Sequence, residues 1–101
     1  MAVLTVLQTG KRYGYELRKL LEGAGDGVVE MSEGTLYQLL HRLEDAGHIR
    51  SEWEAEGRSR PRKYYAISGE GRAHLRMLRT EWSALVTAMQ EMLTTFDEVN
   101  E

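Results

Sequence analysis

The sequence contains no cysteine and a single proline, and its apolar runs are only a few residues long. Without cysteine there is no disulfide, no thiolate nucleophile and no cysteine-bound metal, which fits a reducing compartment. A membrane-spanning helix needs roughly 20 apolar residues, so we expect no membrane partner. The apolar start has neither a basic region nor a hydrophobic run of secretory length, and we expect it to be a core helix of a cytoplasmic protein.

Positive charge is scarce overall but locally concentrated. The 101 residues contain 13 Lys and Arg against 16 Asp and Glu, a formal net charge of -3. Four cations, Arg58, Arg60, Arg62 and Lys63, nevertheless lie within six positions, whereas residues 81–101 contain no Lys or Arg. A basic cluster on an acidic chain favours one docking face for a polyanion. The alternative is a solvated loop that happens to be basic.

The first half of the chain has the pattern of three helices. We expect a short apolar helix over residues 2–7 and a second over residues 13–22, with Gly23 as its C-terminal glycine. A third begins at Ser32, a good N-cap, and ends at Gly47, and its leucines recur at helical spacing. A chain of this length is expected to form a single domain.

After the third helix the apolar period changes to two. Ile49, Ser51 and Trp53 alternate with charged residues, and Tyr65 and Ile67 alternate in a second run. Two alternating runs around a loop of Gly, Ser and Pro predict a β-hairpin. The basic cluster would lie at its tip and on its returning strand.

The C-terminal third predicts one long helix capped by Ser68. Its apolar residues repeat at intervals of three and four, continuing to Val99, which is a heptad pattern. A domain this small cannot bury the whole stripe, so a second copy of the helix, and hence a homodimer, is the economical solution. The alternative is a stripe packed only on its own chain. The expected dimer-interface residues are Leu75, Leu78, Trp82, Leu85, Met89, Met92 and Phe96.

These elements predict a mainly α fold with a small β-hairpin. The order is that of a winged helix-turn-helix over residues 1–68, followed by a long C-terminal dimerisation helix over residues 69–101. In such modules the last helix of the triad enters the major groove of DNA, and the hairpin, or wing, reaches the flanking backbone or minor groove. Taken alone, the polar side of that helix would be only a solvated face.

The motifs resemble those of the PadR family of transcriptional regulators, over about residues 2–95. They are Gly14-Tyr15-Glu16, Gly34-Thr35-Leu36-Tyr37 with Arg42-Leu43-Glu44 and Gly47, and Arg60-Pro61-Arg62-Lys63-Tyr64-Tyr65. The resemblance implies a dimeric winged-helix repressor that binds double-stranded DNA. Some members of the family also bind an aromatic or drug-like effector at the dimer interface. One departure is Glu33, where members of the family usually have Pro after the capping Ser.

The resemblance also implies roles for individual residues. Thr35 and Tyr37 would contact phosphates or bases, and Gln38, His41 and Arg42 would contact base edges. The expected backbone contacts of the wing are Arg58, Arg60 and Lys63. The expected wall of an effector site is Trp82 with Met89, although packing in a dimer seam is an alternative for both residues.

Catalysis and cofactor binding find little support. A zinc site can be drawn around His41 and Asp45, but the three-ligand set that zinc needs is not assembled. The stretch "GAGDG" follows a helix and not a strand, which does not fit a phosphate-binding loop. We therefore expect no enzyme, no metal and no cofactor. The remaining rival is a winged helix that binds only other proteins.

Overall fold

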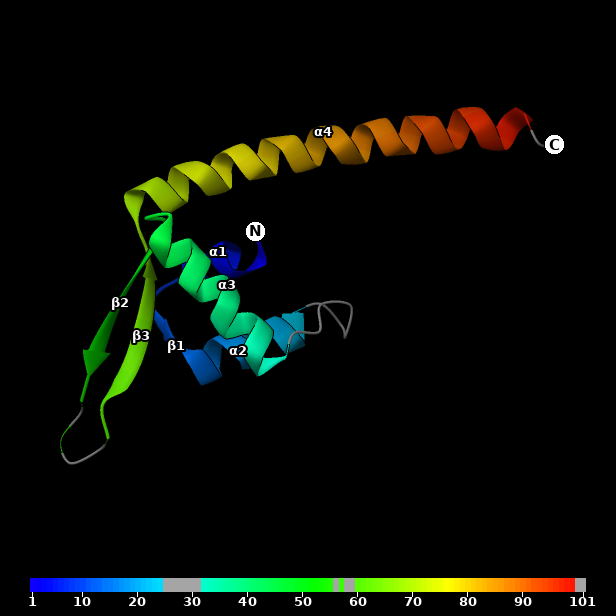
Figure 1. Cartoon of the computed structure of the whole chain (residues 1–101). Helices are drawn as coiled ribbons and strands as arrows, with labels where there is room; N and C mark the ends of the chain where they lie inside the picture. Colours follow the sequence, from blue (N-terminus) through cyan, green and yellow to red (C-terminus); the bar gives the residue numbers. More distant parts are fainter. Residues whose placement is uncertain (25–31, 56, 58–59, 100–101) are drawn as a thin grey trace.

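Helices dominate the fold, and a three-stranded antiparallel sheet accompanies them (Figure 1). The computed structural model describes residues 1–24, 32–55, 57 and 60–99. The predicted mainly α winged helix-turn-helix with a β-hairpin and a long last helix is confirmed. In chain order the elements are α1 (Ala2–Leu7), β1 (Arg12–Tyr13), α2 (Gly14–Ala24), α3 (Glu33–Asp45), β2 (Ile49–Glu54), β3 (Arg62–Ile67) and α4 (Gly69–Val99).

Both ends of α3 form as the sequence predicts. Ser32 is the N-cap, and its Oγ accepts a hydrogen bond of 3.2 Å from the N–H of Thr35. At the other end Gly47 has φ 80°, and the N–H of His48 donates to the carbonyl of Leu43 at 2.9 Å. This is a Schellman closure, and it sends the chain from the end of α3 directly into β2.

The region around α2 differs from its prediction in two respects. The helix passes through Gly23 and ends at Ala24, so Gly23 does not terminate it. A short strand, β1, precedes the helix and pairs Arg12 with Tyr65 and Tyr13 with Tyr64 in β3. Two residues are too few to show an alternating pattern, which is why the sequence did not reveal this strand. Most of the glycine-rich connection after α2, residues 25–31, lies outside the described residues.

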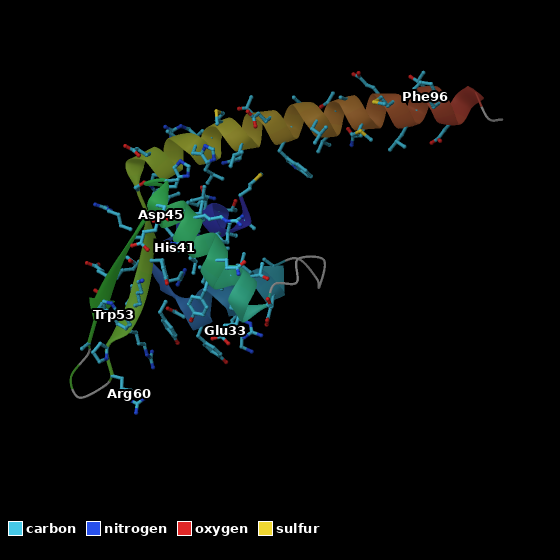
Figure 2. The ribbon with its side chains drawn as sticks, viewed as in Figure 1. Glu33, His41, Asp45, Trp53, Arg60 and Phe96 are labelled. Atoms are coloured by element: carbon cyan, nitrogen blue, oxygen red, sulfur yellow. The ribbon has the colours of Figure 1, made fainter. Side chains whose placement is uncertain are left out.

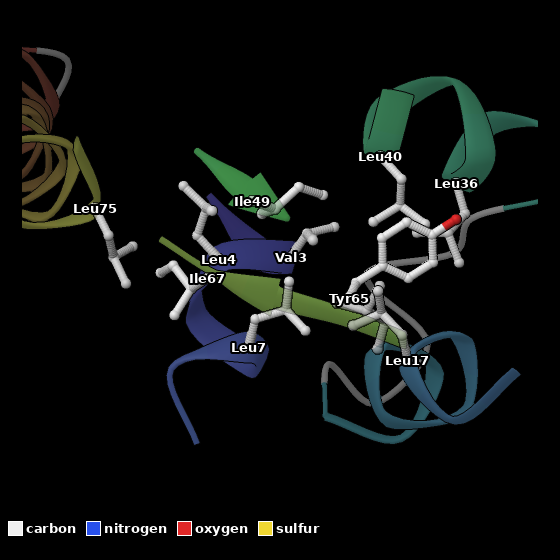
Figure 3. Close-up of a cluster of buried hydrophobic side chains, with 11 residues drawn as sticks. Val3, Leu4, Leu7, Leu17, Leu36, Leu40, Ile49, Tyr65, Ile67 and Leu75 are labelled. Carbon is white, nitrogen blue, oxygen red and sulfur yellow. The ribbon is translucent and has the colours of Figure 1, made fainter. Parts of the chain in front are cut away.

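One core joins the three short helices to the inner face of the sheet and to the beginning of α4 (Figure 3). Every element except β1 contributes to it, so the wing and α4 are held by the same cluster as the helices. The buried hydrophobic residues are Val3, Leu4, Leu7, Leu17, Leu21, Leu36, Leu40, Ile49, Tyr65, Ile67 and Leu75.

The start of α4 is fixed to the base of the wing. Ser68 accepts a hydrogen bond of 3.0 Å from the N–H of Gly71, and its hydroxyl donates to the carbonyl of Gly47 at 2.6 Å. Ser68 therefore caps α4 as predicted. It also ties the helix to the turn that closes α3.

Most of α4 projects beyond the rest of the molecule (Figure 1). A helix of 31 residues is roughly 47 Å long, and the whole chain measures 67 × 28 × 21 Å. Its radius of gyration is 17.6 Å, against about 13 Å for a compact domain of this size. Among the described helices none is long and apolar enough to cross a membrane.

Candidate nucleic-acid interface

The exposed face of α3 presents a row of polar side chains. Leu36 and Leu40 are buried on its opposite face. The predicted contact residues Thr35, Gln38 and Arg42 are all exposed, with spacings of three and four residues that place them on one side of the helix. Amide and guanidinium groups suit base edges, and hydroxyl groups suit phosphates, so this face has the chemistry of a recognition helix.

His41 and Asp45 also lie on the exposed part of α3 (Figure 2). His41 Nε2 is 3.3 Å from Asp45 Oδ2, and both side chains are largely exposed. No group of three or more metal-ligating side chains forms among the described residues. The pair is thus a surface contact between neighbouring turns of one helix.

The wing carries its cations and one large aromatic residue at the end distant from the core. Arg60 is exposed at the tip, and Lys63 faces Trp53 directly across the β2–β3 pair (Figure 2). Arg58 lies outside the described residues. Trp53 shares a face with the buried Ile49, but it is 68% exposed, because it lies beyond the helices that cover the base of the wing.

The acidic residues of β2 are turned to the outer face of the wing. Glu52 and Glu54 pair in register with Tyr64 and Arg62. Lys11, in the loop before β1, forms an ion pair with Glu54, and the hydrogen bond in this pair raises the pKa of Lys11. This contact ties the outer face of the wing to the segment before β1, and it leaves the inner face free of carboxylates from β2.

A row of tyrosines with cations beside their rings runs from the wing to α2. Tyr13 contacts Tyr64 edge-on at 5.7 Å between ring centroids and stacks on Tyr15 at 6.4 Å. The Arg62 guanidinium lies 4.7 Å from the Tyr13 ring centroid, and Lys19 Nζ lies 5.5 Å from that of Tyr15. The sequence analysis did not assign Tyr13, Tyr15 or Lys19 to the interface, because the unpredicted strand β1 brings Tyr13 beside Tyr64 of the wing and starts this row.

Glu33 lies at the N-terminus of α3, where it can affect the approach of a phosphate (Figure 2). Its Oε2 is 3.9 Å from Nη1 of Arg18 in α2, and Arg18 Nε also contacts Glu22 Oε1 at 3.2 Å. One guanidinium is thus shared between two carboxylates. The negative charge of Glu33 is therefore only partly offset.

Tyr37 projects from the first turns of α3 beside the start of α2. It is 46% exposed, and a side-chain carbon added at Gly14 would lie 3.0 Å from its hydroxyl oxygen. The hydroxyl is therefore close to the backbone at the N-terminus of α2. The contact with phosphates or bases that the sequence predicts for Tyr37 stays a prediction.

The stripe of α4 divides into two parts. Leu75 is 3% exposed and packs in the core of its own chain, and Leu78 packs partly against that core. Leu75 is therefore not available to a second subunit, because the beginning of α4 lies against the other elements. The side chain of Val99 lies outside the described residues. Further along, α4 exposes Trp82, Leu85, Met89, Met92, Leu93 and Phe96.

An apolar cavity lies where α1, α2 and α4 meet. Its volume is about 410 Å³, and Met1, Val6, Leu21 and Trp82 are among its lining residues. Met89 does not line it, since Met89 lies about two turns further along α4. The two residues predicted for an effector site are therefore separated within one chain.

Comparison with known proteins gives one consistent family. The sequence profile of the transcriptional regulator PadR-like family matches residues 3–77. A transcriptional regulator from Clostridium thermocellum is 31% identical with a TM-score of 0.81, over 89% of this chain and 87% of the other. A PadR family transcriptional regulator from Eggerthella lenta is 38% identical with a TM-score of 0.77, over 90% and 80% of the two chains.

The fold also resembles a structure that contains DNA. Bacillus subtilis PadR in complex with operator DNA is 22% identical, with a TM-score of 0.69. The alignment covers 76% of this chain and 44% of that one. At this identity the likeness concerns the fold.

Proposed function

Because the chain belongs to the PadR-like family of transcriptional regulators, we propose that it binds a specific operator as a homodimer and represses transcription there. The family and the similar solved proteins are regulators and not enzymes. In this proposal residues 1–68 bind DNA in the cytoplasm and residues 69–101 form the dimer. The operator DNA bound to Bacillus subtilis PadR, which shares the fold, supports duplex DNA as the partner.

The observation that carries DNA binding is the combination of α3 with the wing. Gln38 and Arg42 are exposed on α3, and Arg60 and Lys63 lie on the adjacent hairpin. A recognition helix in the major groove and a basic wing on the flanking backbone would use these two surfaces together. Either surface alone would be an ordinary solvated face.

The dimer is supported by the apolar residues that α4 leaves exposed. Trp82 is 55% exposed where α4 passes α1 and α2, and Met89, about two turns further along the helix, is 44% exposed. Isolated helices are marginal in water, so this part of α4 needs a partner for stability. A second copy supplies the same stripe, which makes a closed twofold contact.

A small planar aromatic effector is supported by the cavity beside Trp82. Its volume of about 410 Å³ lies within the range of small-molecule sites, and its lining is almost entirely apolar. With Trp53 replaced by Phe, Trp82 is the only tryptophan. Planar dyes that bind there should quench its fluorescence and weaken DNA binding. Dyes that change neither signal would remove the effector from the proposal.

The experiment that tests the regulator is selection of bound duplexes from a random pool. We expect a defined sequence that binds ~10³-fold or more tightly than random duplex at physiological salt. A reporter gene behind that sequence should fall in expression when the protein is present, whereas a rise would identify an activator. Absence of duplex binding even at low salt would instead favour a winged helix that binds only proteins.

A further inference from the structure

A cleft separates the wing from the N-termini of α2 and α3. Its volume is about 310 Å³. Trp53, Arg62 and Lys63 line it on the wing side, and Tyr15 and Tyr37 line it on the helix side. We call it the wing cleft. The roles predicted from the sequence assign to DNA only Tyr37 and Lys63 among these residues.

The chemistry of the wing cleft is aromatic and cationic. The large uncharged side chains that line it are all aromatic, and its charged lining residues are Arg62 and Lys63. None of the described residues that line it carries a carboxylate. Lys63 Nζ lies 5.6 Å from the centroid of the Tyr65 ring, so it is held at the side of the cleft. A ligand with an anionic group attached to an apolar ring fits this combination.

Trp53 is the most unusual feature of the wing cleft. It is the most exposed large hydrophobic side chain among the described residues, although it lies on the face of the wing that is buried nearer the core. A tryptophan that only stabilised the hairpin would be expected to pack against it. Tyr15 and Tyr37, which line the same cleft, are exposed as well, and a group of exposed aromatic residues beside a cation is typical of a binding surface.

Resting on the proposed function, we infer that the wing cleft holds the sugar–phosphate strand that runs between the two grooves. If α3 lies in the major groove and the wing reaches the adjacent minor groove, one DNA strand passes between them, where the cleft lies. Trp53 packs on a deoxyribose ring, and Lys63 and Arg62 contact its phosphate. Trp53 is therefore a DNA-contact residue of the wing.

The two tryptophans of the chain allow a direct test. In the Trp82→Phe protein, Trp53 is the only tryptophan, and its quenching by acrylamide is measured free and with a labelled random-sequence duplex at low salt. Binding is followed independently by anisotropy of the duplex label. We expect acrylamide quenching of Trp53 to fall severalfold at saturation, while that of Trp82 in the matched Trp53→Phe protein stays unchanged.

A second measurement uses affinity. Trp53→Ala should weaken binding by about tenfold at every salt concentration, because the lost contact is not ionic. Trp53→Phe should retain most of the affinity, and thermal unfolding should show that both variants fold. Duplex binding with unchanged quenching of Trp53 would overturn the inference and leave the proposed function intact. No binding by any variant, or by the parent protein, would overturn both.

Discussion

Gly71 lies at the point where α4 meets the base of the wing. A Cβ at this position would be 2.0 Å from the carbonyl oxygen of His48 and 2.9 Å from Cγ1 of Ile67. Such distances require the backbone to move, so we expect Gly71→Ala to lower the free energy of unfolding by at least about 2 kcal/mol. Chemical denaturation measures this. Gly69→Ala is the matched control, since a Cβ there meets no atom within 4 Å, and equal losses in both variants would contradict the steric explanation.

Glu33 places a carboxylate at the N-terminus of the recognition helix. Glu33→Gln removes its repulsion of a nearby phosphate, and we expect DNA affinity to rise by about threefold to tenfold. Anisotropy titration of a selected duplex measures the change. Glu22→Gln is the control, because Glu22 also contacts Arg18 but belongs to the C-terminal part of α2. An equal gain in both variants would show that release of Arg18, and not the charge of Glu33, is the cause.

Tyr65 connects stability to pH. Burial raises the pKa of its hydroxyl above the ordinary value of 10.0, and the charges of Tyr37 and Glu44 add to this effect. Because this pKa is higher in the folded than in the unfolded state, protonated Tyr65 contributes to the free energy of unfolding. This contribution is complete below the unfolded pKa and is lost as the pH rises through the folded pKa. We expect unfolding midpoints to fall as the pH rises above about 10, and less steeply for Tyr65→Phe. Identical slopes for the two proteins would exclude Tyr65 as the titrating group.

At the scale of elements, the wing is a hairpin whose charges are sorted by face. The carboxylates of β2 pair outward, and Arg60 and Lys63 remain at the tip and the inner face. Each cation that contacts phosphate releases counterions, so Arg60→Gln and Lys63→Gln should each make the negative slope of log affinity against log salt shallower by about 0.9. Arg79→Gln on α4 is the control with the same change of charge. If it lowered the slope equally, net charge and not contact would be responsible.

The elements that could be predicted are those that local chemistry determines. Ser32 and Gly47 define α3 by its caps, and the alternation from Ile49 to Trp53 defines a strand, because these signals act within a few residues. The strand β1 depends on a partner more than 50 positions away, Tyr65, and leaves no local pattern.

The same limit applies to the candidate site. Gln38 and Arg42 could be placed on α3 from helical spacing alone. Two cation–ring contacts could not be predicted in this way. The contact of Arg62 with Tyr13 depends on β1 and on the packing of α2, and the contact of Lys19 with Tyr15 depends on a side-chain rotamer. The exposure of Trp53 depends on how far the helices reach along the wing, and spacing does not encode that distance.

At the scale of the whole molecule, the cations of α3 and the wing lie apart from the exposed apolar residues of α4. The cations of the proposed DNA face lie on α3 and the wing, whereas residues 80–101 contain acidic groups and no Lys or Arg. The projecting part of α4 therefore repels polyanions and exposes an apolar stripe, which is the surface proposed to bind a second copy. This arrangement favours two recognition helices joined through α4, each with its own wing.

The dimer itself is tested on α4. Met89→Glu places a charge in the exposed stripe, and we expect sedimentation to show a shift from dimer to monomer, because a buried unpaired carboxylate is costly. Helix content should fall as well, since the projecting part of α4 loses its partner. Duplex affinity should drop by about 10² when two linked sites become single sites. Thr87→Glu adds the same charge on the opposite side of the helix and should remain dimeric. If the two variants sedimented as the same species, the stripe would not be the dimer interface.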